Sequence, residues 1–150
     1  MAWTLNENGV TMQPAEDLSY DQYKFVSQVD NGVTGGYGTG ANTVVKSKFG
    51  DYPMGIVANE PSGAKSGIGT TGPEGYQVAA NVITNGFTKV VVDAAYDPGT
   101  VVYAGLTGTL AGYATQATGG NLKYARGILR EGSVQLNDVV TVQLIDNNPA

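Results

Sequence analysis

The sequence predicts an all-β fold, and three observations support this. Twenty-two glycines and a charged fraction of 14% are typical of short strands joined by many turns rather than of helices or disorder. The stretch from Val82 to Tyr103 consists of β-branched and aromatic runs separated by turn residues. No helix of more than one or two turns is indicated, although residues 15–20 allow a short one. We therefore expect an antiparallel β domain organised around residues 82–103.

The two turns of this central stretch have distinct chemistry. Asn85-Gly86 separates the runs 82–84 and 87–92, and an Asn-Gly pair favours a tight hairpin because both residues tolerate positive φ. Asp97-Pro98-Gly99 is a second turn signal, since proline fixes φ and glycine accepts the left-handed conformation. The β pattern resumes at residues 100–103. The sequence thus predicts an antiparallel meander at the centre of the domain.

Further strands are expected on both sides of the meander. They lie at residues 18–29, 43–47, 54–57, 122–129 and 139–145, with a weak strand at 113–116. The strand at 139–145 alternates cleanly between apolar and polar residues, which fits a strand with one buried face and one face in contact with solvent. The glycine-rich segments 32–42 and 59–75 are predicted to be long surface loops, and loops of that length are usually functional.

The first 17 residues lack sustained alternation and are read as an extended arm that precedes a single β domain at residues 18–150. A disordered terminus is the simpler interpretation, because chain ends are loose unless something holds them. Trp3 and Leu5 are unusually apolar for a free tail. We therefore expect the apolar side chains of the arm, Trp3, Leu5, Val10 and Met12, to contact a neighbouring subunit or a partner surface.

Composition excludes several classes of function. The chain has no Cys and no His, which removes the usual nucleophiles, bases and soft metal ligands, and we expect no metal, no cofactor and no enzymatic activity. A net charge of −5 with scattered basic residues argues against nucleic acid or an anionic membrane as partner. No apolar run is long enough for a membrane span, and no signal peptide is recognisable.

The remaining chemical motifs are weak. The glycine pattern at residues 67–72 has no strand before it or helix after it, so it is read as a loop rather than a dinucleotide site. Asp93 and Asp97 could serve a hydrolase that uses carboxylates alone, but solvated faces and turn caps are the default for such pairs. Nine tyrosines favour core packing, with a minority at an interface. Tyr37 and Tyr76, if exposed, would suit contacts with a partner or stacking on sugars in a fibre, baseplate or carbohydrate-binding module.

Several short motifs follow one another along the chain in a recognisable order. They are the segments DLSYDQYKFV at 17–26, DYPMGIVANEP at 51–61, DPGT at 97–100, ARGIL at 125–129 and VVTV at 139–142. The motifs determine fold rather than chemistry, and together they extend over most of residues 16–145. In this order they resemble the capsid decoration, or cement, proteins of tailed bacteriophages. The arm before residue 15 and the loop at 32–42 depart from the family pattern.

This resemblance implies a small β-barrel or β-tulip fold and a non-enzymatic role. Members of the family are usually homotrimers that bind the outer surface of a mature icosahedral head at three-fold or quasi-three-fold positions and bridge capsomers. The implied partners are the major capsid protein and further copies of the chain, on a virion assembled in the host cytoplasm. Under this reading Trp3, Leu5, Val10, Met12, Tyr37 and Tyr76 are the candidate contact residues.

Overall fold

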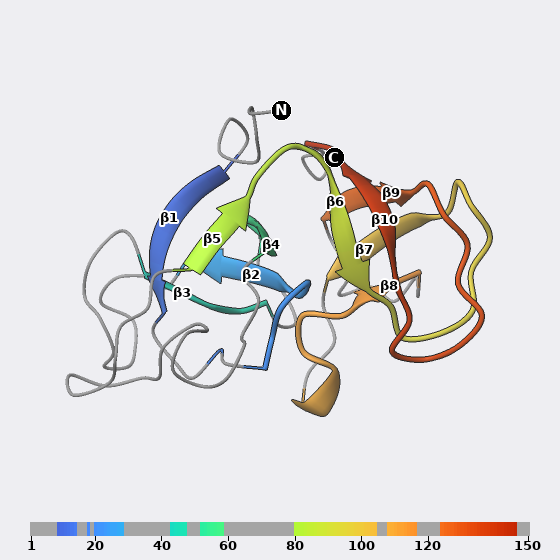
Figure 1. Cartoon of the computed structure of the whole chain (residues 1–150), viewed down its shortest axis with the longest axis horizontal. Coiled ribbons are helices and arrows are strands. Elements are labelled where there is room, and N and C mark those ends of the chain that lie inside the picture. Colours follow the sequence, from blue (N-terminus) through green and yellow to red (C-terminus); the bar gives the residue numbers. More distant parts are fainter. Residues whose placement is uncertain are drawn as a thin grey trace.

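A computed structural model of the chain describes residues 9–14, 18, 20–28, 43–47, 52–58, 80–104, 108–116 and 124–146. The described residues form an all-β molecule with two bodies side by side (Figure 1). The first is a five-stranded barrel and the second a five-stranded sheet. A single 3-10 turn, η2 (Gly108–Leu110), is the helical element among these residues. The predicted all-β class is confirmed.

The barrel closes because each of its strands pairs with two others, in the order β1-β3-β2-β4-β5. All these pairings are antiparallel except β1 with β3, which is parallel and matches Gln13 with Thr43. Closure between β1 and β5 pairs Gly9 with Ile83. The strands are β1 (Gly9–Pro14), β2 (Phe25–Gln28), β3 (Thr43–Lys46), β4 (Gly55–Val57) and β5 (Ala80–Ile83).

Alternate residues of the barrel wall serve two different cores. Successive side chains of a strand point to opposite faces, and here both faces are apolar. Val26, Val57 and Val82 belong to the cluster inside the barrel. Their chain neighbours Phe25, Ile56 and Ile83 belong to the cluster between the barrel and the second sheet. The barrel is therefore also one wall of the core that it shares with the sheet.

The second sheet has the order β6-β10-β9-β7-β8 and is antiparallel. Its longest pairing runs from Val139 opposite Val91 to Leu144 opposite Gly86. A bridge between Val92 and Ala114 draws the two edges of the sheet together beyond the end of β6. The strands are β6 (Gly86–Val91), β7 (Val101–Ala104), β8 (Ala114–Thr115), β9 (Ala125–Leu129) and β10 (Val139–Leu144).

The predicted Asn85-Gly86 hairpin is wrong. The runs on either side of it do form strands, β5 and β6, but β5 pairs with β1 and β4 whereas β6 pairs with β10. Gly86 does adopt a positive φ of 83°, whereas Asn85 does not, so the local signal was correct for the glycine alone. The bend carries the chain from the barrel to the sheet instead of folding it back. The central meander is likewise wrong, because β10 and β9 lie between β6 and β7.

The predicted strand at 18–29 is shorter, and the predicted arm contains a strand. Tyr23 has a positive φ of 69°, which an L-residue rarely adopts, and the strand starts only at Phe25. The Tyr23 amide donates to the Val57 carbonyl at 2.7 Å and its carbonyl accepts from the Val91 amide at 3.0 Å. This unusual conformation thus joins β4 to β6. Within the arm, residues 9–14 form β1 of the barrel.

Other local predictions agree with the structure. The Thr100 amide donates to the Asp97 carbonyl at 3.3 Å, and Gly99 has a φ of 93°, as the Asp-Pro-Gly signal predicts. The strands expected at 43–47, 54–57, 113–116, 122–129 and 139–145 all appear in part or in full. The predicted loops at 32–42 and 59–75 lie outside the described residues.

One buried arginine ties the two bodies together. Arg126 lies on β9 and is 3% exposed. Its guanidinium donates to the carbonyl oxygens of Pro53 at 2.9 Å, Met54 at 2.8 Å and Thr84 at 3.0 Å, and also to that of Ile145. Pro53 and Met54 precede β4, Thr84 follows β5 and Ile145 follows β10. The single side chain therefore fixes the start of β4 and the crossover into β6 against the second sheet.

Candidate functional site

The structure describes two of the six residues expected to contact a partner. Trp3, Leu5, Tyr37 and Tyr76 lie outside the described residues. Val10, on β1, is 41% exposed, so it is accessible for the contact that the sequence predicts. Met12 is 6% exposed and packs inside the barrel with Val44 and Val82. Its side chain is thus part of this chain's own core.

The described residues hold no cluster of three or more potential metal-ligating side chains. No helix in this part of the chain has the length and apolar content of a membrane span. Asp93 and Asp97, the carboxylates considered for hydrolysis, lie on the connection between β6 and β7. The Asp93 carboxylate accepts a hydrogen bond from the Tyr96 hydroxyl at 2.5 Å, which commits one of its oxygens to the fold.

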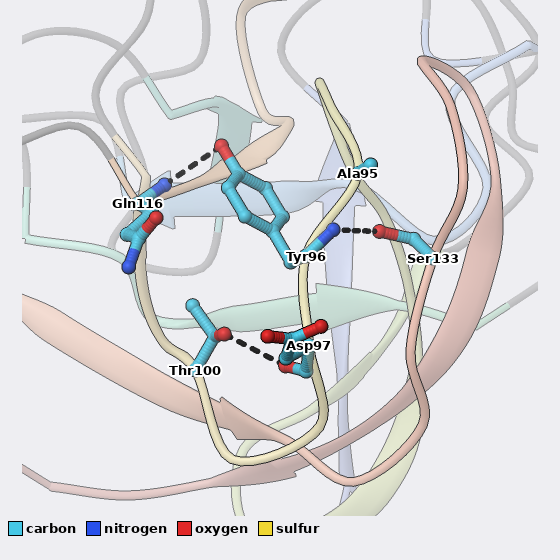
Figure 2. Close-up of a pocket in the computed structure, with 6 residues that line it drawn as sticks. All are labelled: Ala95, Tyr96, Asp97, Thr100, Gln116 and Ser133. Atoms are coloured by element: carbon cyan, nitrogen blue, oxygen red, sulfur yellow. Dashed lines mark hydrogen bonds between the residues drawn. The ribbon is translucent and has the colours of Figure 1, made fainter.

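A pocket of about 230 Å³ lies beside these residues, at one end of the second sheet (Figure 2). Three segments that are distant in sequence meet here. The β6–β7 connection supplies most of the wall, Gln116 follows β8, and Ser133 belongs to the β9–β10 connection. The lining residues are Ala95, Tyr96, Asp97, Thr100, Gln116 and Ser133.

Backbone hydrogen bonds hold the pocket walls together. Tyr96 and Ser133 exchange two of them, with N···O distances of 3.3 and 2.9 Å. The Ser133 hydroxyl also donates to the Ala94 carbonyl at 2.8 Å and accepts from the Tyr96 amide at 2.9 Å. The two connections are therefore joined across the sheet end in a fixed register.

The Tyr96 hydroxyl is held at several points. It donates a hydrogen bond to the Asp93 carboxylate and accepts one from the backbone amide of Gln116 at 3.0 Å. Partial burial, followed by the hydrogen bond to Asp93, raises the pKa of Tyr96 above its ordinary value of 10.0. The two hydrogen bonds at the hydroxyl hold the ring in one orientation.

A second candidate surface is the outer face of the second sheet. Register places Phe87, Gln143, Ile128 and Val101 in one row across β6, β10, β9 and β7. Phe87 is 60% and Val101 40% exposed, so both ends of this row are accessible apolar side chains. The sequence analysis missed the row because it depends on which strands are neighbours.

No family model matches the sequence, and no curated protein matches it. Among solved structures, the chain is similar to the head fiber gp8.5 N base in bacteriophage phi29, with a TM-score of 0.59 and 12% identity over 95% of this chain and 96% of that chain. It is also similar to a chain in the capsid of Myoviridae phage XM1, with a TM-score of 0.56 and 22% identity over 90% of this chain and 82% of that chain.

These likenesses concern nearly the whole chain, so they apply to the barrel and the sheet together and not to one of them. At identities of 12% and 22% they establish a shared fold. That fold occurs in proteins of phage heads and capsids, in agreement with the resemblance found in the sequence.

Proposed function

We propose that this chain is a structural protein of a bacteriophage head that binds the outer surface of the mature capsid and stabilises it by bridging capsomers. The observation that carries the proposal is the likeness, over at least 90% of the chain, to a head fiber base and to a capsid chain. The motif order in the sequence supports it independently. In this role the chain catalyses no reaction.

Stabilisation follows from mass action. A ligand that binds the assembled lattice but not its separated parts stabilises the lattice by its binding free energy. If the chain is a homotrimer at three-fold or quasi-three-fold sites, three linked contacts raise the effective affinity without any new interaction. The outer-face row ending in Phe87 and Val101, together with Val10, supplies accessible apolar surface for such contacts.

The test uses heads of the phage that encodes the chain, purified from a mutant in which the gene is disrupted. Purified protein is mixed with mature heads and sedimented. We expect saturable binding, a higher temperature of head disruption, and the mass of a trimer by light scattering. A monomer that remains in the supernatant at all concentrations would contradict the proposal.

A truncation tests the contribution of the arm. Residues 9–14 are a barrel strand, so the deletion must stop at residue 8 to leave the fold intact. We expect loss of head binding with an unchanged circular dichroism spectrum. Binding at full affinity by the truncated protein would place the contact elsewhere, and the variant Phe87→Glu would then test the outer face of the sheet.

The similarity to a head fiber base favours a second candidate, in which the same body anchors a longer projection on the head. Cryo-electron microscopy of decorated heads distinguishes the two. A cement protein gives density that ends at the barrel and the sheet, whereas a fibre base gives density that continues outward from them.

A further inference from the structure

One edge of the second sheet carries backbone groups that the described fold leaves unused. Among the described residues, β6 pairs with β10 and with no other strand. The amide of Val92 donates to the residue that precedes β10 at 3.0 Å, whereas that of Val91 donates in the opposite direction, to the Tyr23 carbonyl, at 3.0 Å. Backbone groups alternate between the two sides of a strand, so those of Phe87 and Lys89 face away from β10.

Phe87 and Lys89 thus form an open edge. Neither has a backbone hydrogen bond on this side within the part of the chain that the structure describes. Phe87 is 60% exposed and the Lys89 side chain 48%. Their amides and carbonyls, spaced roughly 7 Å apart along the strand, are the groups with which an added strand pairs. Since open edges recruit strands from other chains unless they are covered, this edge fits one short extended segment.

The first eight residues of the chain have the composition of such a segment. They read MAWTLNEN. Trp3 and Thr4 are favourable strand residues, and Trp3 and Leu5 share one face of an extended chain. If Leu5 pairs antiparallel with Phe87, Trp3 lies opposite Lys89. That register joins two apolar side chains and sets an indole beside an ammonium group, which is a favourable cation–π pair.

The arm starts at the end of the molecule where β6 also starts (Figure 1). It precedes Gly9, which pairs with Ile83, and β6 begins at Gly86, three residues after Ile83. Three residues span at most about 11 Å, whereas eight extended residues span about 26 Å. Residues 6–8 are therefore enough to leave the barrel, and residues 2–5 can pair with an edge nearby.

The arm leaves its own chain on the side away from its own open edge. β1 and β10 occupy one side of the path from β5 to β6. The open edge lies on the other side, where the Tyr23 backbone makes hydrogen bonds to both Val57 and Val91. We propose that residues 2–5 of one copy add to β6 of a second copy as an antiparallel strand.

Such a contact joins two different surfaces of the same chain. It is therefore heterologous, and it closes into a ring when it is repeated around a symmetry axis. The inference rests on the trimer of the proposed function and adds which segments hold that trimer together. No capsid chain takes part in the contact, so it can be tested in solution.

The experiment is disulfide cross-linking of the full chain, which has no cysteine of its own. The double variant Leu5→Cys/Phe87→Cys sets thiols at a directly opposite pair, where Cα atoms about 5.5 Å apart allow a disulfide. After mild oxidation, a non-reducing gel should show a band at three times the chain mass, and reduction should return it to one. Leu5→Cys/Val101→Cys is the matched control, because Val101 is also exposed but lies at the far end of the outer-face row, and it should stay at one chain mass.

A second variant, Lys89→Pro, tests the backbone pairing itself. Proline removes an amide that the described fold does not use, and edge strands tolerate it where that amide faces outward. An added strand loses its donor there and meets the proline ring. In light scattering over a dilution series, we expect the trimer to dissociate at a protein concentration at least about tenfold higher than for wild type. Lys89→Ala retains the amide and should weaken the trimer less, and circular dichroism checks that both variants are folded.

Three results would overturn the inference: no band above one chain mass, equal cross-linking in the Val101 control, or equal dissociation of folded Lys89→Pro and Lys89→Ala. Head binding is measured separately by sedimentation. A cross-linked trimer that ignores heads would refute the capsid role and leave the arm contact standing, whereas a chain that binds heads without forming the cross-link would do the reverse.

Discussion

Arg126→Met should be among the most damaging single substitutions in the described part of the chain. Methionine preserves most of the apolar stem of arginine and removes the guanidinium. Four carbonyl oxygens then lose their donor, those of Pro53, Met54, Thr84 and Ile145. These oxygens lie on both bodies of the molecule, so the substitution weakens the contact between barrel and sheet.

The size of the effect follows from the burial of each bond. The bond to Pro53 is buried and the other three are partly buried. A buried acceptor left unpaired costs about 1 to 3 kcal/mol, while a partly buried one regains water and costs about 0.5 to 1 kcal/mol. The free energy of unfolding should therefore fall by about 4 kcal/mol, a large share of the roughly 5 to 15 kcal/mol of a typical domain.

Equilibrium unfolding in urea measures this loss, and two further variants make it specific. Arg126→Lys retains the charge but not the planar fork, and should lose about half as much. Arg130→Met is the matched control: that guanidinium lies one residue beyond β9 and makes two solvent-exposed hydrogen bonds to the Gln143 side chain, at 3.0 and 2.8 Å, which should be worth less than about 1 kcal/mol. If Arg126→Met and Arg130→Met cost the same, Arg126 does not tie the two bodies together.

Four other substitutions test further contacts of the fold. Glu131→Gln removes a carboxylate whose pKa is lowered from 4.5, chiefly by hydrogen bonds from the Thr141 amide and hydroxyl and then by Lys89. The stabilisation that this carboxylate gives the folded state is present above pH 4.5 and is lost as the pH falls through the lowered folded-state pKa. The difference in Tm between Glu131→Gln and wild type should therefore vanish in acid. Tyr96→Phe should lower the free energy of unfolding by about 1 kcal/mol near neutrality. Because burial and Asp93 raise the folded-state pKa of Tyr96 above 10.0, the wild type should lose this advantage as the pH rises from 10.0 through the raised folded-state pKa. An unchanged difference in Tm at alkaline pH would contradict the assignment. Gly55→Ala places a Cβ 2.2 Å from the Ile83 carbonyl oxygen, which is backbone, whereas the Cβ of Gly127→Ala lies 2.6 Å from a methyl of the buried Val142 side chain. Chemical denaturation should show a loss of about 3 kcal/mol or more for the first, and a smaller loss for the second because the contact is less short and is not with backbone.

Local features of the fold could be predicted from the sequence because they depend on neighbours along the chain. The turn at Asp97-Pro98-Gly99 follows from the φ values of two residues, and β10 follows from alternation over six residues. The side-chain pattern of β2 was harder to predict. Both Phe25 and Val26 are fully buried, since that strand separates two cores, and a pattern with both faces apolar does not reveal which face meets which core.

Strand partners could not be predicted in the same way. Asn85-Gly86 has the composition of a hairpin, and Gly86 takes the expected positive φ. Whether the chain then folds back or crosses to another sheet depends on which strand competes for the edge of β6. The competitor is β10, about fifty residues later in the chain, and it pairs with β6 over six positions. A two-residue turn signal contains no information about that competition.

Arg126 and the Tyr96 pocket were invisible to sequence reasoning for a related reason. The donors of Arg126 reach carbonyls that are 19, 42, 72 and 73 residues away, and the acceptors are backbone groups that any residue would supply. The sequence around Arg126 is an ordinary strand. Its importance comes from three other segments, those before β4, after β5 and after β10, whose carbonyl oxygens lie within reach of its guanidinium.

The chain order explains why such a residue is needed. All five barrel strands precede all five strands of the sheet, so the chain crosses between the two sets once, at residues 84–86. A single covalent crossing leaves the two bodies free to hinge unless other bonds oppose it. Arg126 donates a hydrogen bond to the Thr84 carbonyl at that crossing. The Tyr23 backbone makes hydrogen bonds to Val57 in the barrel and to Val91 in the sheet. The hydrogen bonds therefore act where hinging would begin, and the apolar cluster around Phe25, Ile56 and Ile83 fills the space that hinging would open.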